Sequence, residues 1–200
     1  MRRAIETMFL LLLASPAQAQ GWSFEVSGFL CKPPHDSGYF SPVGSADRQR
    51  LHFEVRYNYE DLETVSAFAG WKLAAGGEIA LEATPILGLV AGATDGLAPG
   101  IEAEVTWKQF ATYIESEYVF DLDAGDESFL YTWSETTYAA AGWLRAGIAA
   151  QKTETYHTAL DVQRGVMAEA SRGAWLLGVY WFNPDRSHDG VLQCSLAYQF

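Results

Sequence analysis

The sequence predicts an all-β fold of about twelve antiparallel strands. Apolar and polar side chains alternate with a period of two, most clearly over 50–60, where odd positions are apolar or aromatic and even positions are polar or charged. Turn signals such as Ala75-Gly76-Gly77 and Asp95-Gly96 separate these runs at short intervals. The chain is 49% hydrophobic and 14% aromatic, which excludes a disordered protein.

Twelve segments meet these criteria in chain order, and we predict an antiparallel up-and-down arrangement with short turns. They are 22–32, 38–46, 49–60, 63–74, 77–90, 99–108, 110–120, 127–138, 142–151, 160–171, 173–183 and 190–200. The weakest is 38–46, because it contains Pro42, and 62–75 also has a composition that suits a helix. Ten or eight strands are therefore alternatives to twelve.

The first 19 residues read as a secretory signal peptide rather than as part of the fold. Arg2 and Arg3 precede the apolar run 8–14, and Ala17-Gln18-Ala19 is a small-x-small cleavage site. The apolar run is too short for a spanning helix, which needs about 20 residues. We expect cleavage after Ala19, export in a Gram-negative bacterium, and a single mature domain over 20–200.

The charge balance and the cysteine count exclude further classes. Acids outnumber bases 25 to 13, which gives a formal net charge of −12, so the basic footprint of a nucleic-acid-binding protein is absent. Two cysteines, Cys31 and Cys194, are too few for a disulfide scaffold. In the predicted first and last strands, the two side chains lie on opposite faces. A disulfide between neighbouring strands needs both side chains on one face, so we expect two free thiols.

The polar faces of several strands carry carboxylates in series. In a soluble sandwich this face would meet solvent, whereas in a membrane barrel it would line a wet lumen and the apolar face would meet lipid. Alternation alone does not distinguish these two arrangements. The residues predicted to line the lumen are Arg50, His52, Glu54, Arg56, Glu78, Glu82, Glu102, Glu104, Lys108, Glu115 and Glu117.

The last strand separates the two arrangements. Leu192, Cys194, Leu196, Tyr198 and Phe200 form one apolar row that ends on an aromatic residue. This row resembles the C-terminal insertion signal of bacterial outer-membrane β-barrels, in which a terminal Phe follows a Tyr two residues earlier. The resemblance extends to the signal peptide and to the alternation of the mature chain.

This resemblance implies a closed transmembrane barrel in the outer membrane, with lipid and the outer-membrane assembly machinery as partners, the latter through the C-terminal strand. The acidic lumen predicts either a porin-like, cation-preferring passive channel or a salt-bridged, closed structural barrel. Outer loops are expected at 33–37, near 61, and at 91–98, 121–126, 152–159 and 184–189, and tight turns at the opposite ends. A secreted soluble β-barrel that binds a ligand is the alternative.

Two further groups of residues bear on catalysis and metal binding. Ser187-His188-Asp189 lies in one predicted loop, as a barrel-embedded lipid hydrolase would require, but no Gly-x-Ser-x-Gly elbow accompanies it. The histidines show no i,i+2 or i,i+4 pair, so we predict no metal site and no cofactor. The row Phe129, Tyr131, Trp133 and Glu135 is aromatic and ends in an acid, which we place at the membrane interface.

Overall fold

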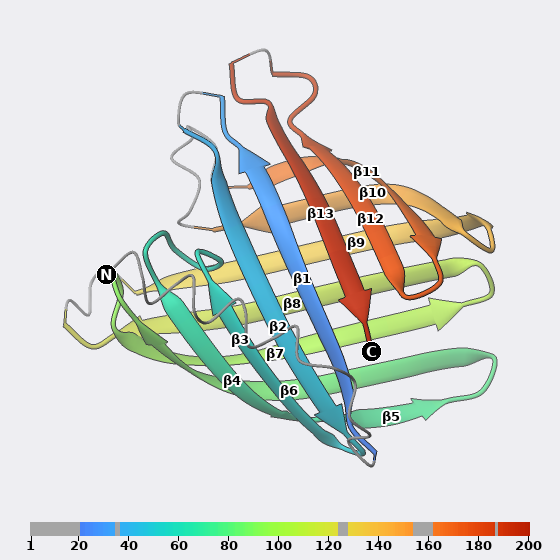
Figure 1. The fold of residues 1–200 in the computed structure, drawn as a ribbon, viewed down its shortest axis with the longest axis horizontal. Helices are drawn as coiled ribbons and strands as arrows, with labels where there is room; N and C mark the ends of the chain where they lie inside the picture. Colours follow the sequence, from blue (N-terminus) through green and yellow to red (C-terminus); the bar gives the residue numbers. More distant parts are fainter. Residues whose placement is uncertain (1–20, 35–36, 124–127, 154–161, 187) are drawn as a thin grey trace.

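The computed structural model describes residues 21–34, 37–123, 128–153, 162–186 and 188–200, so the predicted signal peptide lies outside the described residues. Its strands form one antiparallel sheet (Figure 1). No helix among the described residues is long and apolar enough to cross a membrane. The strands are β1 (Ser23–Lys32), β2 (Tyr39–Arg48), β3 (Leu51–Tyr57), β4 (Val65–Trp71), β5 (Leu73–Gly76), β6 (Ile79–Ala91), β7 (Gly96–Trp107), β8 (Phe110–Asp121), β9 (Phe129–Ala141), β10 (Leu144–Lys152), β11 (Gln163–Arg172), β12 (Trp175–Phe182) and β13 (Val191–Gln199).

The thirteen strands make a barrel of twelve staves, because β4 and β5 are one stave with a break. Both strands pair with β6 in the same register, through Gly70 with Ile86 on one side of the break and Leu73 with Ala83 on the other. The break falls opposite Pro85, which has no N–H to donate to the ladder. The predicted twelve-strand count is confirmed.

The barrel closes between its first and last strands. β1 pairs with β13 over eight residue pairs, and Figure 1 shows the two strands lying side by side. The backbones of Phe24 and Phe200 exchange two hydrogen bonds of 2.9 Å, and their rings stack with centroids 5.6 Å apart. Closure pairs the described strands on both sides, apart from the four-residue β5, which pairs only with β6. A closed sheet is the condition for a β-structure to persist in lipid.

The two ends of the barrel differ. One end, here called the turn end, has two-residue connections at 49–50, 77–78, 108–109, 142–143 and 173–174. The other, here called the loop end, has connections of four to ten residues at 33–38, 58–64, 92–95, 122–128, 153–162 and 183–190. This asymmetry is typical of outer-membrane barrels and confirms the predicted positions of loops and turns.

The strand containing Pro42 also forms as predicted. Pro42 pairs with Gly28 of β1, while the ladder between β2 and β3 begins only at the next residue, Val43. Its missing N–H therefore costs no hydrogen bond to β3.

The outer surface is apolar and the interior is polar or aromatic. Exposed side chains on the strands include Leu30, Val55, Leu89 and Ile148, whereas inward neighbours such as Arg56 and Glu115 are buried. This arrangement is the reverse of a soluble barrel, so the soluble alternative is not favoured. The strand faces that carry carboxylates in series, which the sequence predicts to line the interior of a membrane barrel, do face the interior.

One interior contact depends on a glycine. The Phe68 ring lies against Gly88 of the neighbouring strand β6, and a Cβ added at Gly88 would overlap that ring. Phe68 is itself buried. We therefore expect Gly88→Ala to destabilise the barrel by about 1–3 kcal/mol through overpacking.

The measurement is urea unfolding of the protein in lipid vesicles, followed by the mobility of the folded form on an unheated gel. Gly44→Ala in β2 is the matched control, because no atom lies within 4 Å of a Cβ built there. Equal midpoints for the two variants would contradict the packing role of Gly88.

Candidate functional site

The candidate site is the inner wall, where one guanidinium meets five carboxylates. Arg56 on β3 points into the barrel, and 1% of it is exposed. Its Nη1 lies 3.0 Å from Glu60, 2.7 Å from Glu115 and 2.6 Å from Glu117. Its Nη2 lies 3.5 Å from Glu102, and its Nε donates to Glu54. We call these six residues the Arg56 cluster.

The fold brings the cluster together from distant parts of the chain. Glu54 and Arg56 share the inner face of β3, Glu60 follows in the loop after β3, and the other carboxylates come from β7 and β8. With all groups ionised, the cluster carries four more negative charges than positive. Such an excess in a poorly solvated interior is costly unless hydrogen bonds, protons or cations offset it.

Neutral side chains supply part of that offset. The hydroxyl of Ser66 donates to Glu60 at 2.7 Å, and the hydroxyl of Tyr113 donates to Glu115 at 3.1 Å. The guanidinium carbon of Arg56 lies 4.7 Å from the Tyr59 ring centroid and 4.4 Å from that of Phe68. These aromatic faces stabilise the buried cation.

Side chains pack closely in the lumen at the level of the cluster. Arg56 and Glu117 are each 1% exposed, and Glu60 is fully buried. Between this level and the loop end, aromatic rings fill the interior. The ring centroids of Tyr59 and Tyr131 lie 5.2 Å apart, and those of Trp133 and Phe182 lie 5.7 Å apart. A cavity of about 20 Å³ among these rings has room for about one water molecule.

The lumen is more open toward the turn end. Inward positions there are small or polar and only partly covered, as at Ser27, Ser45, Thr106 and Ala197. Glu82 lies on the same inward row of β6 as the buried Thr84, yet it is exposed. On the turn-end side of the Arg56 cluster, the side chains of the inner wall are therefore partly exposed, and we call this side the vestibule.

A second charged group lies across the interior. Arg145 on β10 binds Glu169 on β11 through two bonds of 2.7 and 2.8 Å. One oxygen of Glu135 accepts bonds of 2.9 Å from Trp133 Nε1 and from the Tyr180 hydroxyl. Acidic side chains on both sides of the interior therefore have ion-pair or hydrogen-bond partners.

The structure corrects part of the predicted lumen set. Arg50, Glu78 and Lys108 lie in two-residue turns and are exposed, so they are outside the inner wall formed by the strands. The alternating pattern in the sequence continues for a residue or two into these turns, so the predicted strands were too long at this end. The predicted residues on the inward rows of the strands are His52, Glu54, Arg56, Glu82, Glu102, Glu104, Glu115 and Glu117.

Sequence reasoning missed other interior residues. The row of Tyr131, Trp133 and Glu135 is buried inside the barrel rather than placed at the membrane interface. Its terminal Glu135 was the available signal, because a strand face that ends on an acid suits the lumen better than lipid. Glu60 has a polar position in the alternating stretch 50–60 but was not included in the predicted lumen set; in the structure it lies in the loop after β3.

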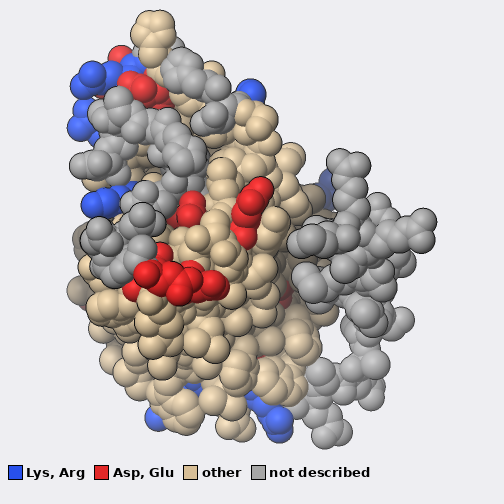
Figure 2. All heavy atoms as spheres, turned by 90° about the vertical axis from the view of Figure 1, so that its left-hand side faces the viewer, with Lys and Arg blue, Asp and Glu red and all other residues tan. Residues whose placement is uncertain are grey.

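The outer wall has the features of a lipid-facing surface. Aromatic residues form a belt at the turn end, with Trp71, Trp107, Trp143 and Trp175 all exposed, and Trp181 is exposed near the loop end. Aliphatic side chains cover the wall between them. Figure 2, which faces the side where several loops lie in Figure 1, shows acidic side chains gathered within a largely uncharged surface.

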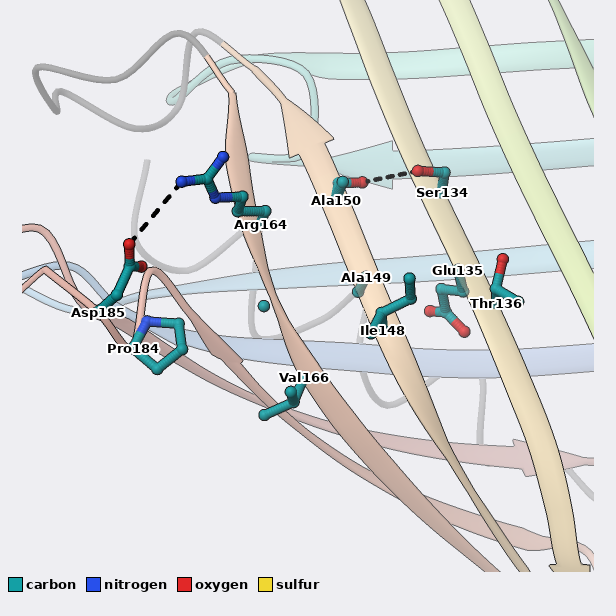
Figure 3. Close-up of a pocket in the computed structure, with 11 residues that line it drawn as sticks. Ser134, Glu135, Thr136, Ile148, Ala149, Ala150, Arg164, Val166, Pro184 and Asp185 are labelled. Atoms are coloured by element: carbon teal, nitrogen blue, oxygen red, sulfur yellow. Dashed lines mark hydrogen bonds and ion pairs between the residues drawn. The ribbon is translucent and has the colours of Figure 1, made fainter.

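A pocket of about 450 Å³ lies on the outer wall rather than in the lumen (Figure 3). It lies against β9, β10 and β11, with Ile148 and Val166 on its floor and Arg164 at its edge, 3.8 Å from Asp185. Both of these charged side chains are more than half exposed, so the pair is weak. The pocket lining is mostly apolar, which fits contact with lipid.

Two other sequence candidates have clear placements. Cys31 is buried in the interior and Cys194 lies on the outward row, paired across the seam with Leu30, and no disulfide joins these two described residues. His188 is exposed in the loop after β12. Ser187 lies outside the described residues, so the Ser187-His188-Asp189 hypothesis is not tested.

A closed twelve-stave barrel with an apolar outside and a charged inside defines the class of outer-membrane β-barrels. The chain has the fold of the Acinetobacter baumannii outer membrane protein Omp33, with 13% identity and a TM-score of 0.53 over 90% of this chain and 100% of that one. Weaker likenesses, with TM-scores of 0.44 and 0.42, are to the outer membrane protein OpdK of Pseudomonas aeruginosa (11% identity, 90% and 67% of the two chains) and a BenF-like porin of Pseudomonas fluorescens Pf-5 (11% identity, 92% and 65%). No protein-family model and no curated protein matches the sequence.

The geometry of the cluster predicts a large effect of removing its one cation. Arg56→Met leaves five carboxylates facing one another in a closed interior, so we expect a loss of about 3–5 kcal/mol in the free energy of unfolding. Urea titration in lipid vesicles measures it.

Arg164→Met is the control, because its ion pair with Asp185 is exposed on the outer wall. That variant should change the free energy of unfolding by less than about 1 kcal/mol. An Arg56 variant as stable as the control would show that the cluster does not stabilise the barrel.

Proposed function

We propose that the protein is an outer-membrane β-barrel with a porin-like acidic lumen. The membrane location is supported by the apolar outer wall, by the aromatic belt at the turn end, and by long loops at one end only. The predicted signal peptide supplies the route of export. The row that ends at Phe200 belongs to the strand that closes the barrel, which suits its proposed recognition by the assembly machinery.

We propose further that the lumen is a narrow passive pathway that prefers small cations. The observation that carries this proposal is the series of inward carboxylates, with Glu104 on the vestibule side and Glu102, Glu115 and Glu117 at the constriction. Carboxylates in a confined lumen attract cations and repel anions. The Arg56 cluster and the aromatic rings beyond it form the constriction, and side chains of both must shift for an ion to pass.

A closed structural barrel is the second candidate. It is favoured by the near-complete burial of Arg56, Glu60 and Glu117, and by the aromatic rings beyond them. In that case the lumen contributes stability and the outer surface carries the function. Neither proposal includes a catalytic step.

Single-channel recording in planar bilayers separates the two candidates. Changing both Glu102 and Glu104 to Gln keeps the side-chain volume and removes two lumen charges. For a cation pathway, we expect the reversal potential in a salt gradient to shift toward zero while the channel still opens, since charge sets the preference.

Asp185→Asn is the matched control, because Asp185 is exposed in the loop after β12, outside the inner wall, and its loss should leave the reversal potential unchanged. Absence of current through the wild-type protein would exclude the pathway and leave the closed barrel. An unchanged reversal potential in the double variant would show that these carboxylates do not select the ion.

A further inference from the structure

A buried histidine on the inner wall has one nitrogen fixed and the other unused. The side chain of His52 is 8% exposed, and its Nδ1 lies 2.8 Å from Asp47. Asp47 is held in turn by Lys72 at 3.0 Å. An ionised Asp47 accepts a hydrogen bond from Nδ1–H, which leaves the lone pair of a neutral imidazole on Nε2.

That lone pair faces two carboxylates. Nε2 lies 3.8 Å from an oxygen of Glu54 and 3.8 Å from an oxygen of Glu102, too far for a hydrogen bond to either. It has no hydrogen-bond partner among the residues that the structure describes. A lone pair between two anionic groups is repulsive, and a cation among the three would turn that repulsion into attraction.

We propose that His52, Glu54 and Glu102 bind one divalent transition-metal ion of the zinc type. The three ligand atoms lie within 4.8 Å of one another. A tetrahedral ion with ligands at about 2.0–2.2 Å places them about 3.3–3.6 Å apart. The two 3.8 Å separations from Nε2 are a few tenths of an ångström longer than this, and the two carboxylate oxygens, which lie within 4.8 Å of each other, would move closer together by up to about 1 Å on binding. The fourth position is left for water from the vestibule.

The surroundings support this assignment. Asp47 orients the imidazole through its second nitrogen, which is the usual outer-shell arrangement for a metal-bound histidine. One oxygen of Glu54 contacts Arg56 and the other faces His52, so this carboxylate serves both groups. The Arg56 cluster has an excess of negative charge, and a divalent ion beside it reduces that excess.

The donor set also selects among cations. Mg²⁺ and Ca²⁺ prefer sites made of oxygen ligands, whereas an imidazole nitrogen favours Zn²⁺, Ni²⁺ or Cu²⁺. The histidine spacing considered in the sequence could not find this site, because its other ligands are acids. Glu54 lies on the same strand face, and Glu102 arrives from a different part of the barrel.

Calorimetric titration of the chelator-treated protein in detergent micelles with Zn²⁺ tests the proposal. We expect one saturable site, a loss of affinity of at least about tenfold in His52→Gln, and a loss of about 10–100-fold in Asp47→Asn. Mg²⁺ should not compete. His188→Gln is the matched control, because His188 is exposed in a loop, and its affinity should equal that of the wild type.

Heat-modifiable gel mobility establishes that each variant is folded, and Glu102→Gln provides a second ligand change if His52→Gln does not fold. X-ray absorption of the zinc-loaded wild type should show one imidazole among oxygen ligands. No saturable binding, wild-type affinity in both ligand variants, or an all-oxygen shell would overturn the proposal. These readouts do not use conductance, so they are independent of the proposed pathway.

Discussion

The ion pairing of Arg56 with carboxylates from several strands is the interaction on which the interior of this barrel depends. Twelve staves enclose more space than short side chains can fill, so long charged and aromatic side chains must meet across it. Arg56 reaches partners on β7, β8 and the loop after β3, and the rings of Tyr59 and Phe68 flank it. The cluster therefore joins parts of the wall that share no backbone hydrogen bonds.

This arrangement divides the lumen into two regions of different character. Between the cluster and the loop end, the interior is packed with rings such as Tyr131 and Trp133. Toward the turn end, small side chains leave a vestibule in which acids remain accessible. The proposed selectivity for cations and the proposed metal site both arise at the boundary, where His52, Glu54 and Glu102 meet the edge of the cluster.

The same imbalance of charge links stability and function. A barrel stabilised only by apolar packing would have no reason to gather five acids around one base. Breaking a buried ion pair costs more than its net contribution to folding, because it leaves an unpaired charge behind. The acids are therefore tolerated only while Arg56, hydrogen-bond donors or an added cation offsets them, and each of these offsets can also change how ions enter the lumen.

Much of the wall was predictable from the sequence because side-chain alternation depends only on local geometry. The strands, the closure of β1 on β13 and the inward positions of His52 and Glu115 follow from a period of two and from parity. Contacts across the lumen were not predictable, because they depend on the tilt and register of distant strands. Glu60 is an example, since the alternation over 50–60 gives it a polar position but does not assign it to Arg56.

Some turn residues, in contrast, were predicted to line the lumen and do not. Lys108 continues the polar row of β7 in the sequence, yet it has a φ of 54° in a two-residue turn, and its Nζ lies 4.6 Å from the Trp107 ring centroid. Two-residue hairpin turns use positive φ values and reverse the direction of the chain, so the alternation of β7 ends at Trp107, where the turn begins.

The most direct test of the central claim is a double-mutant cycle between Arg56 and Glu117, measured as free energies of unfolding in lipid vesicles. The cycle uses Arg56→Met, Glu117→Gln and the two changes combined. If the cluster holds the interior together, the combined variant will be more stable than the sum of the single losses predicts, with a coupling energy above about 1 kcal/mol. Additive losses, within about 0.5 kcal/mol, would show that Arg56 and Glu117 contribute independently and would contradict the account.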